Sequence, residues 1–164
     1  MLIARRGLAT VIDYSAVAGA LGVLAAVTLL RRSRQPAGER RDPDPATLRL
    51  MVAAGVTVPL SCALAVADAT GGTPGKRALG LTVEDATSGS TPTFQQALVR
   101  SALKTAIPWE LGHQAVWDFR SGHTRRGSVL AAGAYLALGA QAAAILRNRP
   151  TYADRLANTQ VHER

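Results

Sequence analysis

Three apolar blocks without a charged residue dominate the hydrophobic pattern of the chain: residues 14–30, 50–67 and 127–146. Each block approaches the ~20 residues that a helix needs to cross a bilayer. The blocks show almost none of the polar positions at a 3.6-residue period by which a soluble helix faces water. We therefore predict apolar helices at about 7–30, 48–68 and 127–147, with Pro59 kinking the second.

Arginines stand at the ends of these blocks, where their side chains can reach lipid headgroups: Arg31, Arg32, Arg34, Arg125, Arg126, Arg147 and Arg149. The many small residues inside the blocks allow helix backbones to approach closely in a membrane. A soluble bundle of Ala-rich helices is the alternative, and the missing polar faces disfavour it. The pattern predicts an all-α membrane protein.

Residues 94–118 form a helix of a different kind. Thr93 followed by Gln96 has the form of a capping box that opens this helix. The segment carries polar or helix-breaking residues along its length: Arg100, Lys104, Pro108, Glu110 and His113. A central Arg or Lys costs ~2.5–3.5 kcal/mol in lipid, so these side chains must face protein or water. We expect an interfacial or broken helix here, in addition to about three to four apolar helices and a short β element.

Two polar stretches separate the helices. Residues 31–47 combine Pro, Gly and mixed charge and predict a flexible polar loop, whereas residues 69–92 predict a turn and a short strand. The turn motif of Gly72, Pro74, Gly75 and Lys76 leaves the second helix, and we place Lys76 at headgroup depth. The alternating segment 79–85 can pair with the carboxyl-terminal NTQVHE segment. Together these elements make one membrane domain over residues 1–164.

The Gly-Lys pair of the turn is not part of a nucleotide-binding P-loop. Such a loop requires a first glycine where this chain has Thr70, and Ser or Thr where it has Arg77. The formal net charge of +8 does not indicate nucleic acid either, because only 4% of the residues are aromatic and 48% are hydrophobic. We expect no nucleotide and no nucleic acid as partner. The lipid bilayer and its anionic headgroups are the expected partners.

The amino terminus resembles an export signal in its Arg pair and apolar run. Asp13, however, falls inside what would be the apolar core of that signal, and the run continues to Leu30. We therefore expect the first helix to remain part of the protein. Its expected location is the cell membrane, as a multi-pass protein.

Several motifs together resemble the bacterial RDD family of multi-pass membrane proteins. They are Arg6 and Asp13 seven residues apart, GGTPGKRALGLTVED, ALVR at 97–100, and YADRLANTQV near the end. The resemblance assigns the family arginine to Arg6 and the two family aspartates to Asp13 and Asp154. This chain departs from the family pattern at Ala153, where His is common, and at Asn158, where Gly is common. The resemblance implies a membrane protein of unsettled function, with sodium/proton exchange or other transport proposed for some members.

The three family residues admit both structural and functional roles. A spacing of seven returns to nearly the same helix face, so we predict that Arg6 pairs with Asp13. The alternative makes Asp13 an ion or proton site, together with Glu110 and His113. Asp154 is either an exposed residue at a helix start or a partner of Arg6, which requires both termini on one side of the membrane.

Other candidate chemistry is sparse. Glu110 and His113 have the i, i+3 spacing of carboxylate-bridged metal sites, but the chain lacks the second pair that such sites need. No Ser-His-acid set or paired-cysteine motif is present. We predict neither enzymatic activity, nor a cofactor, nor a metal.

Two functions from different classes remain. The first is transport of a small cation or proton, which requires Asp13 and Glu110 to face a hydrated cavity. The second is a noncatalytic subunit that scaffolds or regulates a membrane partner or forms a homo-oligomer, with closed ion pairs and an exposed face of small residues. The topology is also open, since positive-residue counts place the 31–49 region in the cytoplasm and the family pattern places the termini there.

Overall fold

The computed structural model describes residues 2–36 and 44–163. The chain is mostly helical, with one two-stranded sheet. The elements in chain order are α1 (Leu2–Ser33), α2 (Pro45–Val52), the π-helical η2 (Ala53–Thr57), α3 (Val58–Ala69), α4 (Pro74–Ala78), β1 (Leu81–Asp85), α5 (Phe94–Ser101), the π-helical η3 (Ala102–Ala106), α6 (Ile107–Arg120), α7 (Thr124–Leu146), α8 (Tyr152–Leu156) and β2 (Thr159–Glu163).

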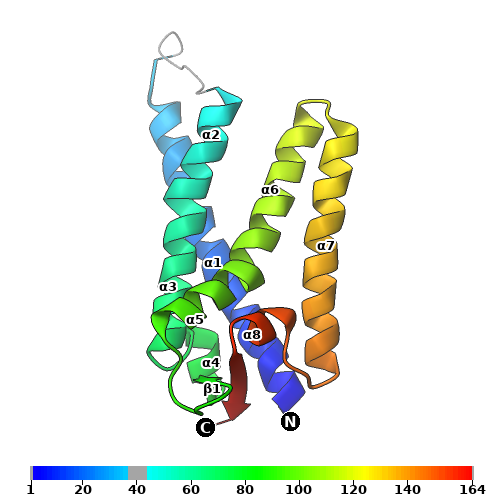
Figure 1. Ribbon diagram of the computed structural model, residues 1–164. Coiled ribbons are helices and arrows are strands. Elements are labelled where there is room, and N and C mark those ends of the chain that lie inside the picture. The colour runs from blue at the N-terminus through cyan, green and yellow to red at the C-terminus, as the bar shows by residue number, and fades with distance from the viewer. Residues whose placement is uncertain (1, 37–43, 164) are drawn as a thin grey trace.

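Long helical segments make up the body of the molecule, and the small elements gather at one end (Figure 1). There α4, α8 and the sheet lie close to both chain termini. The 3-residue connection between α6 and α7 makes these two helices an antiparallel pair, since 121–123 is all that joins them. This arrangement brings residues from the beginning, middle and end of the sequence to the same end of the fold.

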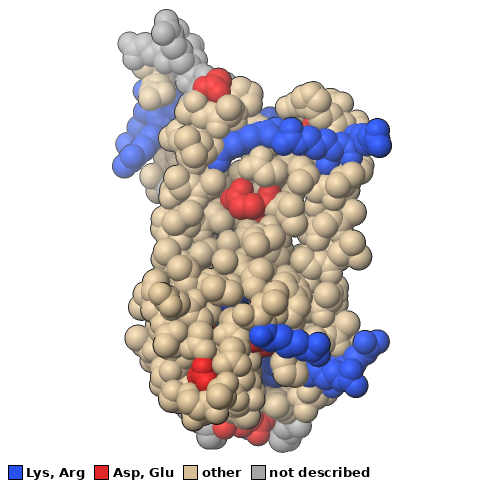
Figure 2. Space-filling model, viewed as in Figure 1, with Lys and Arg blue, Asp and Glu red and all other residues tan. Residues whose placement is uncertain are grey.

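Two helical segments are long and apolar enough to cross a membrane: Pro45–Ala78 and Thr124–Leu146. In their most apolar windows only 17% and 11% of the residues are buried, so these are not the core helices of a soluble protein. The distribution of charged side chains also fits a membrane-crossing arrangement. Figure 2 shows Lys and Arg gathered near the two ends of the molecule, with a largely uncharged surface between them.

Helix ends differ from the predicted ones where capping chemistry is strong. Asp44 accepts hydrogen bonds from the backbone amides of Ala46 and Thr47, both at 3.0 Å, and starts α2 with Pro45 in its first turn. Helix α1 likewise continues to Ser33. The flanks of the predicted 31–47 loop are therefore partly helical, and its residues 37–43 lie outside the described ranges.

Each of the two central helical runs contains a π-helical segment two residues before a proline. In the second run, the Ile107 amide donates to the Ala102 carbonyl, which is the i→i+5 spacing. This shift takes the Ile107 amide away from the Leu103 carbonyl, and Pro108 has no amide hydrogen to donate to the Lys104 carbonyl. Tyr152 donates its hydroxyl to the Leu103 carbonyl at 2.7 Å. Gln141 donates to that of Lys104 at 3.1 Å. The predicted 94–118 helix is thus continuous but irregular, and its freed carbonyls bind α7 and α8.

The sheet confirms the predicted pairing of the two short segments. Strands β1 and β2 are antiparallel, with Val83 opposite Val161. Leu81 and Val83 are fully buried. The capping box of Thr93 and Gln96 is also present at the start of α5. The sheet closes the terminal end of the fold over a buried interior that, in the described residues, contains more polar than apolar side chains.

Candidate functional site

A network of buried ion pairs occupies the interior at the terminal end. Arg100 of α5 is at its centre and is 3% exposed. Its Nε donates to Asp154 of α8 at 2.7 Å, and its Nη1 donates to Asp68 of α3 at 2.5 Å. Lys76 of α4 donates to the other oxygen of Asp68, also at 2.5 Å. One guanidinium therefore ties together elements that are far apart in the sequence.

Asp154 joins this network from the last helix. It is 1% exposed, and it forms a capping box with Thr151, whose amide donates to the carboxylate at 3.0 Å. Burial acts to raise the pKa of Asp154, but the Arg100 charge and the Thr151 hydrogen bonds outweigh it and hold the pKa well below its usual range. The carboxylate is ionised at neutral pH.

Arg6 of α1 reaches the same carboxylate. Its Nη2 lies 3.6 Å from Asp154 Oδ2, and its Nη1 donates to the Arg149 carbonyl at 3.2 Å. The alternative in which Asp154 is an exposed residue at a helix start is therefore wrong, although it does stand in the first turn of a helix. The predicted ion pair between Arg6 and Asp13 is also wrong, because these residues bind different partners.

Asp13 is held by neutral donors instead. The Thr73 hydroxyl donates to Asp13 Oδ2 at 2.5 Å, and the Gly75 amide donates to Oδ1 at 2.8 Å. A Cβ on Gly75 would lie 2.3 Å from the carbonyl oxygen of Ala9, so this position of the turn motif must be glycine for α4 to reach α1. Gly72 adopts a φ of +113°, which also favours glycine, and Pro74 begins α4.

The predicted headgroup position of Lys76 is corrected by the structure. Lys76 is 4% exposed and pairs with Asp68, because α4 folds back against α1 and turns this side chain inward. The neighbouring Arg77 is exposed and donates to the Thr70 carbonyl at 3.2 Å. The turn motif thus delivers one amide to Asp13 and one ammonium to Asp68.

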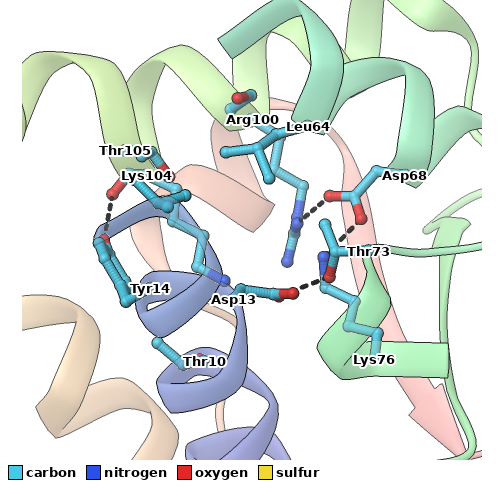
Figure 3. A pocket seen from close by; sticks show the side chains of 12 residues that line it. Thr10, Asp13, Tyr14, Leu64, Asp68, Thr73, Lys76, Arg100, Lys104 and Thr105 are labelled. Carbon is cyan, nitrogen blue, oxygen red and sulfur yellow. Dashed lines mark hydrogen bonds and ion pairs between the residues drawn. The ribbon is translucent and has the colours of Figure 1, made fainter. Parts of the chain in front are cut away.

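Lys104 differs from the other interior cations. Within residues 2–36 and 44–163, its ammonium forms no hydrogen bond and no ion pair. Over the same described ranges, Asp13 is the carboxylate of this region that has no cationic partner within ion-pair distance. Figure 3 shows the Lys104 side chain pointing toward Asp13. Two unpaired opposite charges therefore face each other in the interior.

Two small cavities separate these charges. Their volumes are about 30 and 20 Å³, and Asp13, Lys104, Lys76, Arg100 and Thr10 line both. A cavity of this size holds one water or one small ion. We call the residues that surround these cavities the polar centre: Arg6, Asp13, Asp68, Lys76, Arg100, Lys104 and Asp154. With every group ionised, the polar centre carries one excess positive charge.

Glu110 and His113 do not join the polar centre. Glu110 accepts a hydrogen bond from the Thr57 hydroxyl of η2, and Gln114 donates to it at 3.2 Å. His113 Nε2 accepts from the Trp117 indole at 3.1 Å. Neither residue lines a cavity that Asp13 lines. Across the described ranges, no group of three His, Cys, Asp or Glu residues is arranged to hold a metal.

A third buried carboxylate, besides Asp68 and Asp154, lies toward the other end of the long helices. Asp118 of α6 is 1% exposed, and it lies 2.9 Å from an Arg49 nitrogen and 3.0 Å from one of Arg126. This contact joins α2, α6 and α7 near the arginines that the sequence places at headgroup depth. Asp118 has a structural role as an anchor between helices.

Sequence patterns did not identify Asp68 and Lys104 as members of a site. Asp68 follows the second apolar block directly, and Lys104 was recognised only as a charge that must avoid lipid. Asp68 and Lys104 could have been linked by their charges, because both stand in or next to helices that are otherwise apolar. A buried carboxylate next to one helix requires cations from others.

Comparison with known proteins gives one result. No curated protein and no solved structure shows significant similarity to the chain. The model of the RDD family, in contrast, matches residues 2–158, which is nearly the whole chain. This range includes Arg6, Asp13 and Asp154, the residues that the sequence resemblance assigned to the family motif. The chain belongs to the RDD family.

Proposed function

We propose that this RDD-family protein is a multi-pass membrane protein that transports a small cation or proton through the polar centre. The observation that carries the proposal is the pair of unpaired charges, Asp13 and Lys104, on the walls of the same water-sized cavities. Ionisable groups inside a membrane domain are expensive, and they persist where they are neutralised or serve a pathway. Arg6, Lys76 and Arg100 each form an ion pair with Asp68 or Asp154, whereas Asp13 and Lys104 form none among the described residues.

The proposed membrane arrangement has four crossings. They are α1, the run from α2 to α3, the run from α5 to α6, and α7. At ~1.5 Å per residue, the 23 residues of α7 span about 34 Å, which matches the hydrocarbon thickness. An even number of crossings agrees with the position of both termini at one end (Figure 1). The two bands of basic residues then lie at the two headgroup layers (Figure 2).

The charge distribution and the family arrangement give opposite orientations. The arginine-rich region after α1 favours the cytoplasm for the end opposite the termini, whereas the family pattern places the termini in the cytoplasm. We adopt the family arrangement. A reporter fused at residue 38 tests it: activity of a periplasm-specific reporter supports this orientation, and activity of a cytoplasm-specific one contradicts it.

Transport is tested with the purified full-length chain in liposomes. A pH-sensitive dye inside the vesicles reports proton movement when a gradient of Li⁺, Na⁺ or K⁺ is applied. We expect flux with the wild type, and we expect Asp13→Asn to reduce it at least tenfold because the amide cannot neutralise a cation. Arg155→Gln, at an exposed position of α8, is the control and should retain full flux. Equal flux for the wild type, Asp13→Asn and empty vesicles contradicts the proposal.

Scaffolding is the second function that the structure supports. Arg100, Asp68 and Asp154 form closed ion pairs, and α7 exposes a face with the small residues Ala132, Gly139 and Ala140 beside Leu136. Such a face fits a second membrane helix or a second copy of the chain. Absence of ion flux combined with a stable oligomer in detergent favours this alternative. Cross-linking between single cysteines placed at position 136 is the corresponding measurement.

A further inference from the structure

We propose that Lys104 is the proton-release group of the polar centre, and that one small monovalent cation bound at Asp13 replaces the one proton of its ammonium. This inference rests on the proposed transport function and adds the coupling residue and the stoichiometry. It assigns a role to a residue outside the family arginine and aspartates.

Charge pairing singles out Lys104. Arg6 and Arg100 both contact Asp154, and Lys76 and Arg100 both contact Asp68. Each of those three cations has a carboxylate within 4 Å, whereas Lys104 has none among the residues that the structure describes. Loss of the Lys104 charge therefore breaks no ion pair, whereas loss of the Arg6, Lys76 or Arg100 charge breaks at least one.

The groups around Lys104 come from several helices. Asp13 and Tyr14 belong to α1, Asp68 to α3, Lys76 to α4, Arg100 to α5 and Asp154 to α8. Because Asp68 and Asp154 are already bound by other cations, Asp13 is the carboxylate that remains available to attract either the ammonium or an ion. Figure 3 shows that Lys104 approaches it from the opposite side to Thr73.

The ligands around Asp13 suit a small monovalent cation. The larger cavity is about 30 Å³, and the residues that line it include Asp13, Thr10, Tyr14 and Thr73, whose carboxylate and hydroxyl oxygens are hard ligands. Asp68, Lys76 and Arg100 also line it, but Asp68 is held by the other two. Asp13 therefore supplies the one negative charge that remains available to an ion. A divalent ion requires more carboxylates than this set provides. The volume fits one ion of the size of Na⁺ or Li⁺, or one water.

Two cationic groups cannot occupy this space together. A cation at Asp13 and an ammonium on Lys104 would place two like charges about one water apart, in an interior that already carries an excess positive charge. Binding the ion therefore breaks one N–H bond of the ammonium, and the proton leaves to water while the electron pair stays on nitrogen. The charge of the polar centre is the same before and after. This predicts exchange of one cation for one proton with no net charge movement.

The position of Lys104 in η3 is consistent with such a role. The segment is π-helical, and the Lys104 carbonyl accepts from Gln141 of α7 instead of a helical amide. Irregular turns of this kind are common where a helix must present a side chain for function. The backbone of Lys104 is thus fixed by α7 while its ammonium has no fixed partner among the described residues.

The experiment combines binding and transport with the full-length protein. In weakly buffered detergent solution, adding Na⁺ to the wild type should release about one proton per bound ion, and the apparent affinity should rise about tenfold per pH unit while Lys104 is protonated. Lys104→Arg retains a charge that cannot be released, and it should lose Na⁺-driven proton flux at least tenfold. Lys104→Gln should bind Na⁺ without proton release, and its transport should become sensitive to membrane potential. Thermal unfolding confirms that both variants are folded, and Arg155→Gln is the control.

The outcomes separate the two proposals. Proton-coupled flux in Lys104→Arg within twofold of the wild type overturns the role of Lys104 and leaves transport in place. The same conclusion follows if Lys104→Gln keeps the pH dependence of Na⁺ affinity. Absence of both Na⁺ binding and flux in the wild type overturns both proposals. Loss of flux in Lys104→Arg with unchanged unfolding temperature, together with potential-sensitive transport in Lys104→Gln, supports both.

Discussion

Arg100 bridges two buried carboxylates. Replacing it with a neutral residue should destabilise the protein more than a neutral replacement of any other ion-paired residue. In Arg100→Met, Asp68 keeps Lys76 at 2.5 Å, but Asp154 keeps only Arg6, whose closest nitrogen is 3.6 Å away. Breaking a buried pair so that one charge is left uncompensated costs about 3–5 kcal/mol. For a chain of this size, each kcal/mol lowers the unfolding temperature by about 2–4 °C, so we expect a decrease on the order of 6–20 °C.

The assay is thermal unfolding of the purified protein in detergent at pH 7. A second change, Asp154→Asn, removes the orphaned charge and should restore part of the loss, with a coupling energy of about 1–3 kcal/mol in the double-mutant cycle. Arg126→Met is the matched control, because Arg126 also contacts a buried carboxylate but its side chain is 70% exposed. An exposed pair contributes about 0–1 kcal/mol. Equal unfolding temperatures for Arg100→Met and Arg126→Met, or strictly additive effects with Asp154→Asn, would refute the assigned role of Arg100.

Two further predictions concern the same end of the fold. Because Arg100 and Thr151 lower the pKa of Asp154 in the folded state, its contribution to stability should be fully present above the unfolded pKa of ~3.9 and should decrease as the pH falls below it. The difference in unfolding temperature between the wild type and Asp154→Asn should therefore be constant from pH 7 to 5 and shrink below pH 4, and a difference that grows on acidification would contradict this. Gly75→Ala should destabilise the protein by about 1–3 kcal/mol, because the new methyl group overlaps the Ala9 carbonyl. Gly139→Ala, with no atom within 4 Å of the added Cβ, should leave the unfolding temperature unchanged or raise it.

Local patterns predicted those parts of the fold that depend on neighbouring residues. The apolar blocks gave the long helices, Thr93 and Gln96 gave the start of α5, and the alternating segment 79–85 gave β1. Even the partner of β1 was predictable, because a single short strand with open backbone groups requires a second one, and the chain offers one alternating segment after the last helix. Each of these signals spans a few residues and needs no knowledge of how helices pack.

The Arg6–Asp13 prediction failed because it treated a shared helix face as proximity. Seven residues rise about 10.5 Å along a helix, so the two side chains leave α1 at different levels. Each residue therefore takes a partner from another element at its own level: Arg6 from α8, and Asp13 from the turn before α4 and from α4 itself. Sequence spacing within one helix cannot reveal these contacts, because they depend on the order in which helices pack.

The polar centre depends on features that the sequence shows separately and the fold combines. The π-helical shift leaves the Leu103 carbonyl without its helical donor, and Pro108 offers none to the Lys104 carbonyl. Tyr152 of α8 and Gln141 of α7 donate to these two carbonyls instead. These bonds hold the irregular helix against α7 and α8. They lie about one helical turn after Arg100, which binds Asp154. The same helical run therefore carries Arg100, which forms two ion pairs, and, four residues later, Lys104, which forms none among the described residues. From the sequence, Pro108 predicted only a break in the helix. In the structure it leaves the Lys104 carbonyl to Gln141, and this bond fixes the backbone from which the Lys104 side chain extends toward Asp13.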